Sequence, residues 1–348
     1  MKKYICTFLT SVFLMLFIIA SYMILVDPVF HYHKPIKGIA YKYYEGERYI
    51  NDGITKNWDY NAIITGTSMT ENFKTSEFDA LFNVKSIKVP FAGAHYKEIN
   101  DNLKEAFKSG HDVDIVIRCI DTFTIIDDKD ASRLEEYPLY LTNSNPFDDV
   151  KYWYNKEIIL DGLKYCILGF KGEKISSMDD YSSWDDPEKY GKDRVLSGYN
   201  HKEKIENKHL TKQDIKLIDE NIDQNIISTI KEHPNCQFYL FFQPSSVLYY
   251  DYLYGEGLYY KIWEAKRYVV ERLVAFDNVK FYGWDNKFDI TTNLDYYRDI
   301  SHYSGDLNSK MLEWIRNDNG LINNTYGKYF DECIRFYETY DYNKIFQE

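Results

Sequence analysis

The chain has 348 residues, with 42 lysines and arginines against 54 aspartates and glutamates, and a formal net charge of −12. This acidity argues against a protein that binds nucleic acid, because phosphate binding needs a basic surface. Hydrophobic residues make up 45% of the chain and charged residues 28%, so the composition excludes disorder and low complexity and allows one large α/β domain.

The first thirty residues predict a transmembrane helix. Residues 5–26 carry no charge, and a helix of this length measures about 33 Å, enough to cross a hydrocarbon core of about 30 Å. Lys2 and Lys3 precede the segment, so the positive-inside rule predicts a cytoplasmic N-terminus and an extracytoplasmic remainder. A cleavable signal peptide is the alternative, but the apolar run is long and no good small-residue cleavage site follows it. We therefore expect residues 1–27 to be a retained signal anchor that crosses the cell membrane once.

The five cysteines predict neither disulfides nor a zinc site. They form no C-x-x-C pair, and Cys119 and Cys236 fall in apolar runs typical of buried strands. His31 and His33 with Asp27 are an alternative metal site, although alternating histidines beside a membrane are more often interfacial side chains. No Walker motif or G-x-G-x-x-G occurs, so we expect no metal, nucleotide or other cofactor.

From residue 60 onward, short apolar runs alternate with amphipathic helical patterns, one of them over residues 215–230. Five strands are expected, at residues 61–65, 86–89, 114–120, 237–242 and 279–282. Strands that alternate with helices indicate an α/β fold with a doubly wound parallel sheet, flavodoxin-like and in three layers. We expect this domain to cover residues 60–325.

Three further segments complete the expected organisation. Residues 28–59 are rich in tyrosine and polar residues and look like a juxtamembrane stalk. The β-α alternation stops over residues 122–210, so this stretch, which includes an aromatic helix over 152–170, is interpreted as a helical insertion. Residues 326–348 are expected to form a tyrosine-rich helical tail.

A candidate nucleophile follows the first strand, in the sequence G-T-S-M. Ser68 would lie at the carboxyl edge of the sheet, where open α/β folds bind their ligands. A helix that begins there would add backbone N–H groups and a partial positive charge that favour a developing oxyanion. The structural alternative is that Ser68 and Thr70 only cap this helix.

A candidate acid–base pair precedes the final core helix, in the sequence D-I-S-H. Asp299 stands three residues before His302, so one turn can fold the carboxylate back onto a ring nitrogen and leave the other nitrogen as a base. The alternative is a histidine packed among tyrosines with Asp299 capping a local turn. The pair and Ser68 both lie at strand-to-helix junctions on one edge of the expected sheet, which favours a Ser-His-Asp triad.

With these motifs, the chain resembles the SGNH (GDSL-like) hydrolase superfamily, and more closely its membrane-anchored, extracytoplasmic bacterial branch. That branch includes the D-alanyl transfer protein of teichoic acids and the O-acetyltransferase domains that modify polysaccharides. The resemblance covers about residues 58–318 without the insertion, and it implies the SGNH-hydrolase version of the three-layer fold. It also implies Ser68 as the nucleophile, with Asp299 and His302 as the orienting acid and the base of the family's terminal D-x-x-H.

The oxyanion hole follows the family in one block and departs from it in another. Gly93, in F-A-G-A after the second strand, stands where the family has a glycine whose N–H joins the oxyanion hole. After the third strand, well-known members carry G-x-N-D, whose asparagine donates to the oxyanion, but this chain has C-I-D-T with Asp121. An ionised carboxylate cannot donate a hydrogen bond, so the hole would consist of the Ser68 and Gly93 N–H groups, with Gln243 as a candidate further donor.

The sequence therefore predicts a membrane-anchored extracytoplasmic serine esterase or O-acyltransferase that acts on acyl esters of a cell-surface or secreted polysaccharide. An acyl donor, and a membrane-bound acyl-transfer protein that the sequence does not identify, would be further partners. The alternative is a catalytically silent SGNH-fold surface protein that binds glycan or assists envelope polymer assembly, which Asp121 favours. Tyrosines after the fourth strand would either stack on sugar rings or fill the core: Tyr249, Tyr250, Tyr252, Tyr254, Tyr259 and Tyr260.

Overall fold

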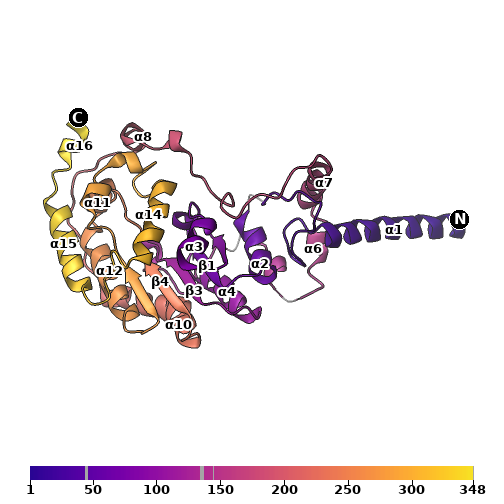
Figure 1. Ribbon diagram of the computed structural model, residues 1–348, viewed down its shortest axis with the longest axis horizontal. Coiled ribbons are helices and arrows are strands. Elements are labelled where there is room, and N and C mark those ends of the chain that lie inside the picture. The colour runs from indigo at the N-terminus through magenta and orange to yellow at the C-terminus, as the bar shows by residue number, and fades with distance from the viewer. Residues whose placement is uncertain (44–45, 134–136, 144, 348) are drawn as a thin grey trace. The chain divides into compact units, whose positions relative to one another are not determined.

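The computed structural model describes residues 1–348 except 44–45, 134–136, 144 and 348 (Figure 1). The chain divides into two compact units. The N-terminal unit comprises Met1–Asp59 and Leu134–Ser182, and the α/β unit comprises Tyr60–Arg133 and Ser183–Glu348. The expected stalk therefore belongs to the same unit as the anchor helix. The inserted segment that joins this unit is 134–182, narrower than the expected 122–210.

The α/β unit is built on five parallel strands in the order β2-β1-β3-β4-β5, which confirms the predicted doubly wound α/β fold. The strands are β1 (Ala62–Gly66), β2 (Ser86–Pro90), β3 (Ile115–Cys119), β4 (Gln237–Phe241) and β5 (Val279–Tyr282). All five residues of β1 are buried, as expected for a central strand covered by helices on both faces.

Helices cover both faces of this sheet (Figure 1). On one face α3 (Thr75–Phe82) packs against α14 (Gly305–Arg316). The other face carries α4 (Tyr96–Lys108), α9 (Lys212–Ile222), α10 (Ser228–Glu232) and α12 (Tyr259–Leu273), and α15 (Tyr326–Thr339) packs on α12. Shorter helices are α8 (Lys192–Ser197), α11 (Val247–Gly255), α13 (Phe288–Thr291) and α16 (Asn343–Gln347). Single 3-10 turns occur at Ser68–Thr70, Thr122–Thr124, Pro187–Lys189 and Leu294–Tyr296.

The helix expected over 215–230 is interrupted by a π-helical turn at Asp223–Ile227. The carbonyl of Asn225 in this turn accepts a hydrogen bond from Nη1 of Arg118 at 2.9 Å. Arg118 lies in β3 and is only 2% exposed, and burial lowers the pKa of its guanidinium to about 10. A buried cation needs hydrogen-bond acceptors. The π-helical turn breaks the regular pattern of helical hydrogen bonds, so that a backbone carbonyl becomes available to Arg118.

In the N-terminal unit, α1 (Lys2–Val26) is long and apolar enough to cross a membrane. The unit also contains α2 (Glu47–Asn57), α5 (Leu139–Thr142), α6 (Val150–Trp153) and α7 (Lys156–Phe170). The single aromatic helix expected over 152–170 is therefore two helices. The chain breaks at Asn155, whose side chain accepts hydrogen bonds from two backbone N–H groups and caps the second helix.

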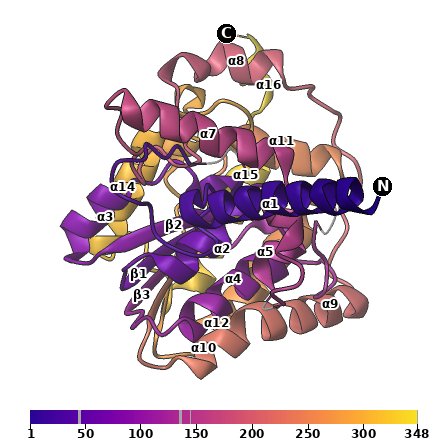
Figure 2. The ribbon, with the colours of Figure 1, turned by 90° about the vertical axis from the view of Figure 1, so that its right-hand side faces the viewer.

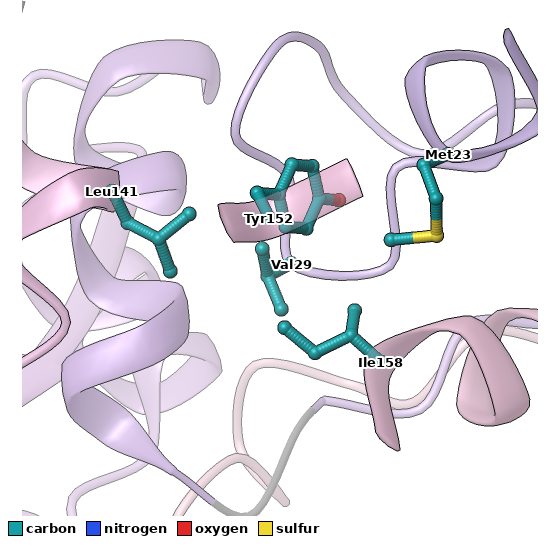
Figure 3. Close-up of a cluster of buried hydrophobic side chains, with 5 residues drawn as sticks. All are labelled: Met23, Val29, Leu141, Tyr152 and Ile158. Carbon is teal, nitrogen blue, oxygen red and sulfur yellow. The ribbon is translucent and has the colours of Figure 1, made fainter. Parts of the chain in front are cut away.

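A buried apolar cluster joins α1 to these later helices (Figure 3). Its members are Met23, Val29, Leu141, Tyr152 and Ile158. Beside the cluster, the carboxylate of Asp27 ends α1 and is fully buried. It accepts hydrogen bonds from the Tyr152 hydroxyl at 2.6 Å and from three backbone N–H groups of residues 31–33. Burial raises the pKa of Asp27, and these donors oppose the rise.

Candidate functional site

The carboxyl ends of three neighbouring strands bring the loops of the site together. In the register of the sheet, Gly66 at the end of β1 pairs with Pro90 of β2, and Thr65 pairs with Arg118 of β3. The backbone N–H of Phe91 then donates to the carbonyl of Gly66 at 2.8 Å. The loops that follow these strands therefore start level with one another at one edge of the sheet.

A glycine is required at the turn into the candidate nucleophile. Gly66 has φ +149°, and a Cβ there would lie 2.8 Å from Cγ2 of Thr70 and 2.9 Å from Cβ of Cys119. The turn leads directly into the 3-10 helix Ser68–Thr70, and the next α-helix begins only at Thr75. The expected α-helix dipole behind Ser68 is therefore absent from this part of the described chain, because one 3-10 turn aligns too few peptides.

The structure brings Ser68, His302 and Asp299 together in one hydrogen-bonded chain. Ser68 Oγ lies 2.8 Å from Nε2 of His302, and Nδ1 of His302 lies 2.7 Å from Oδ2 of Asp299. The serine hydroxyl thus bonds a ring nitrogen and not a backbone N–H, unlike a helix cap. With Asp299 ionised, Nδ1 carries the ring proton and donates a hydrogen bond to the carboxylate. Nε2 is then unprotonated and accepts a hydrogen bond from the Ser68 hydroxyl.

Hydrogen-bond donors around Asp299 keep its carboxylate ionised. Its Oδ1 accepts the backbone N–H groups of Ser301 at 2.9 Å and His302 at 2.8 Å. Burial acts to raise the pKa of Asp299, but the hydrogen bonds from His302 and the backbone, and the positive charge that His302 carries when its ring is protonated, outweigh it and lower the pKa to about 2. The carboxylate is therefore charged at neutral pH and can orient the imidazole.

The loop that carries the pair is held in a tight hairpin. The backbone N–H of Arg298 donates to the His302 carbonyl at 3.0 Å, and Tyr297 forms an antiparallel bridge with Tyr303. The Tyr303 hydroxyl then donates to the carbonyl of Met69 at 3.1 Å, next to the candidate nucleophile. The relative positions of His302 and Ser68 are thus fixed by contacts within the protein itself.

Asp121 lies next to the turn that carries Ser68, as its place after β3 predicts. Its Oδ2 accepts the hydroxyl of Thr67 at 2.8 Å and its Oδ1 accepts the backbone N–H of Phe123 at 3.0 Å. The side chain is buried, and burial raises its pKa although these hydrogen bonds and the charge of His302 oppose the rise. Both carboxylate oxygens act as acceptors, so Asp121 gives no hydrogen bond to an oxyanion at Ser68.

The two other predicted oxyanion donors have different surroundings. Gly93 is exposed with φ +59°, and no hydrogen bond to another described residue engages its N–H or that of Ser68. Gln243 is fully buried after β4, where its Oε1 accepts a weak hydrogen bond from Sγ of Cys119 at 3.6 Å. Among the described residues, Nε2 of Gln243 has no partner, and no hydrogen bond joins this side chain to Ser68 or His302.

Sequence reasoning missed one wall of the site. The Trp184 ring meets the His302 ring edge-on, with centroids 5.4 Å apart, and Nε1 of Trp184 lies 3.4 Å from the carbonyl oxygen of Ser68. The Arg298 guanidinium also lies over this indole, 4.8 Å from the centroid. Trp184 falls in the expected insertion, where no motif or spacing pointed to the triad.

Most of the tyrosines that follow β4 fill the core. Tyr249 and Tyr250 are 1% exposed, and their hydroxyls bond Thr122 at 2.9 Å and Asp285 at 2.6 Å. Tyr254 and Tyr259 are also buried and stack on each other. These four rings present no face on which a sugar could stack, so the core-filling alternative holds for them. In the described parts of the chain, no group of three or more His, Cys, Asp or Glu side chains could hold a metal ion.

Comparisons with known proteins leave the function to be argued from this site. No family model and no curated protein matches the chain. A solved structure from Streptococcus pneumonia, provisionally described as a platelet activating factor, is similar with a TM-score of 0.36 and 14% identity, over 79% of this chain and 91% of that one. The assignment of function therefore rests on the geometry around Ser68.

Proposed function

We propose that this chain is a serine esterase or O-acyltransferase, anchored in the cell membrane through α1, whose α/β unit lies outside the cell and acts on acyl esters of a surface or secreted polysaccharide. The observation that carries the proposal is the hydrogen-bonded chain from Ser68 Oγ through His302 to Asp299, with distances of 2.8 and 2.7 Å. The resemblance of the same motifs to the SGNH superfamily supports this chemistry, and the apolar length of α1 supports the location.

In the proposed reaction, Ser68 Oγ attacks the ester carbonyl while Nε2 of His302 takes its proton. Asp299 stabilises the imidazolium that forms, and the free N–H groups of Ser68 and Gly93 are the candidate donors to the oxyanion. Collapse of the tetrahedral intermediate breaks the ester C–O bond, and His302 returns the proton to the leaving alcohol. Water or a sugar hydroxyl then attacks the acyl-enzyme by the same steps in reverse. None of these steps needs a metal or an organic cofactor.

Labelling with a fluorophosphonate probe tests the proposal directly, because the probe reacts far faster with an activated serine than with an ordinary one. We expect the full chain in detergent micelles to be labelled, and the labelling to be lost in Ser68→Ala and in His302→Ala. Ser109→Ala is the matched control, since this serine lies at the end of α4, where its hydroxyl donates to the Glu105 carbonyl. A folded wild-type chain that takes up no probe would refute the acyl-enzyme.

Asp121 favours a second function, in which the fold is kept and a silent site binds glycan. Its buried carboxylate accepts the hydroxyl of Thr67, the residue before Ser68, and would repel an oxyanion at Ser68. In that case the chain would retain a polysaccharide ligand without labelling, and Trp184→Ala would weaken the binding because it removes a ring from the wall of the site.

A further inference from the structure

Helix α7 has an apolar face that no described part of the protein covers. Four of its apolar side chains recur at helical spacing and are 46–92% exposed: Leu160, Leu163, Ile167 and Phe170. We call them the α7 apolar face. The opposite side of the helix carries the buried residues Ile158, Gly162 and Tyr165. A soluble helix places its apolar residues inward, so an apolar face on each side indicates a second, apolar environment.

Helix α7 contacts α1 near the end of α1 at Val26 (Figure 1, Figure 2). The Tyr22 hydroxyl of α1 donates to the Ile159 carbonyl at 3.3 Å, and a Cβ at Gly162 would lie 2.6 Å from that hydroxyl. The glycine therefore permits this close approach. Just before α7, the hydroxyl of Tyr154 donates to the backbone carbonyl of Leu16 at 3.0 Å. These contacts all lie within the N-terminal unit.

The contact with Leu16 shows how far the junction between α6 and α7 reaches along α1, and therefore how deep it would lie in a membrane. Leu16 precedes the end of α1 at Val26 by ten residues, which is about 15 Å of helix. The hydrocarbon core of a bilayer is about 30 Å thick, so when α1 spans it, the half of α1 nearer to Asp27 lies inside the core. Side chains that pack along this half, and the α7 apolar face next to them, lie at the level of the acyl chains and headgroups.

The charges of this segment suit an anionic surface. In a chain with a net charge of −12, residues 150–174 contain five lysines against three acids. The lysines are Lys151, Lys156, Lys164, Lys171 and Lys174, and the acids are Glu157, Asp161 and Glu173. Exposed lysines beside an apolar helical face are typical of helices that lie in the membrane interface and attract anionic lipid headgroups.

We propose that α6 and α7 are embedded in the membrane interface beside α1, with the α7 apolar face in contact with the acyl chains of an anionic bilayer. The chain is then held by a transmembrane helix and by an interfacial helix, so that the N-terminal unit cannot rotate freely about α1. The inference rests on the anchoring of α1 in the proposed function and is independent of any activity at Ser68.

Photo-cross-linking in the full chain tests this contact. The chain is reconstituted in phosphatidylcholine–phosphatidylglycerol vesicles with p-benzoylphenylalanine in place of Phe170, and lipid adducts are identified by mass spectrometry. Two further variants carry the same photoreactive residue at reference positions. One replaces Phe13 of α1, which is 71% exposed, and reports lipid contact of the anchor. The other replaces Phe346 of α16, which is 41% exposed, and reports on an exposed aromatic position in the α/β unit. We expect lipid adducts at 13 and 170, an adduct yield at 170 that falls when phosphatidylglycerol is omitted, and no adduct at 346.

Each other outcome refutes either the lipid contact of α7 or the membrane anchoring of α1. Adducts at 13 without adducts at 170, or adducts of 170 with a second polypeptide, refute the lipid contact of α7. Equal yields at 170 and 346 refute it as well, because contact would then be unspecific. Absence of adducts at 13 refutes the anchor and the inference with it. Fluorophosphonate labelling of the same samples reports separately on the proposed activity.

Discussion

Replacement of Asp299 by asparagine should disable His302 while leaving its position almost unchanged. Oδ1 of Asp299 accepts two backbone N–H groups, at 2.8 and 2.9 Å, so the amide oxygen of an asparagine will take this place. The amide nitrogen then takes the place of Oδ2, 2.7 Å from Nδ1 of His302. Since the amide nitrogen only donates, Nδ1 must lose its proton, and the proton moves to Nε2. Nε2 can then no longer accept the hydroxyl of Ser68.

The size of the loss depends on how exposed the acid is. In a serine protease with a buried acid, the corresponding change lowers kcat about 10⁴-fold. The Asp299 side chain is 46% exposed, so water screens its charge and replaces part of the imidazolium stabilisation. We therefore expect the labelling rate to fall by roughly 10²–10³-fold, about 3–4 kcal/mol of activation free energy.

The assay is the pseudo-first-order rate of fluorophosphonate labelling of the full chain at pH 7. Asp306→Asn, on the exposed first turn of α14 just after the loop, is the matched control and should label at the wild-type rate. Circular dichroism melting should show that the Asp299→Asn chain is folded. If this folded variant labels within a factor of about three of the wild type, the orienting role of Asp299 is wrong.

Four further outcomes follow from the same contacts. Asp121→Asn should label several-fold faster and melt at a higher temperature at pH 7, because it removes a buried charge beside the oxyanion; an unchanged rate would contradict this. The pKa of Asp299 is about 2 in the folded chain against 3.8 in the unfolded one, so its stabilisation is complete above pH 3.8 and is lost as the pH falls towards 2, and the difference in melting temperature between wild type and Asp299→Asn should shrink over that interval. Tyr152→Phe should lower the free energy of unfolding by about 1–3 kcal/mol in a denaturant titration in detergent, since Asp27 loses a donor in a buried site. Gly66→Ala should abolish labelling and lower the melting temperature, because φ +149° and contacts under 3 Å leave no room for a Cβ; wild-type labelling would show that the turn adapts.

The sheet was predictable because its pattern is local. Each of the five strands is a short apolar run followed by a turn or helix, and the expected and observed ends of the second and fifth strands differ by one residue at most. The pair of Asp299 and His302 was predictable for the same reason, since three residues along the chain suffice to fold the carboxylate onto the ring. Ser68 then followed from its place after the first strand, because parallel strands end at one edge.

Contacts between distant parts of the chain were not predictable from such patterns. Trp184 reaches Ser68 across 116 residues, and Tyr152 reaches Asp27 across 125 residues. Hydrophobic periodicity predicts which side of an element is apolar, but not which partner covers that side. For the same reason, the sequence does not predict that the α7 apolar face is exposed. Its exposure depends on which side of the helix packs against α1.

Asp121 connects the requirements of the fold with those of the proposed reaction. Its carboxylate joins the loop after β1, through the Thr67 hydroxyl, to the loop after β3, through the Phe123 N–H, so it fixes the turn that presents Ser68. In the proposed reaction, the same charge would oppose an oxyanion and slow every attack on the ester carbonyl, by water and by a sugar hydroxyl alike. An acceptor bound against Trp184 would recover rate through proximity, which free water cannot do to the same extent. Within the proposed function, a rigid site with weakened oxyanion stabilisation therefore favours transfer to a bound hydroxyl over hydrolysis.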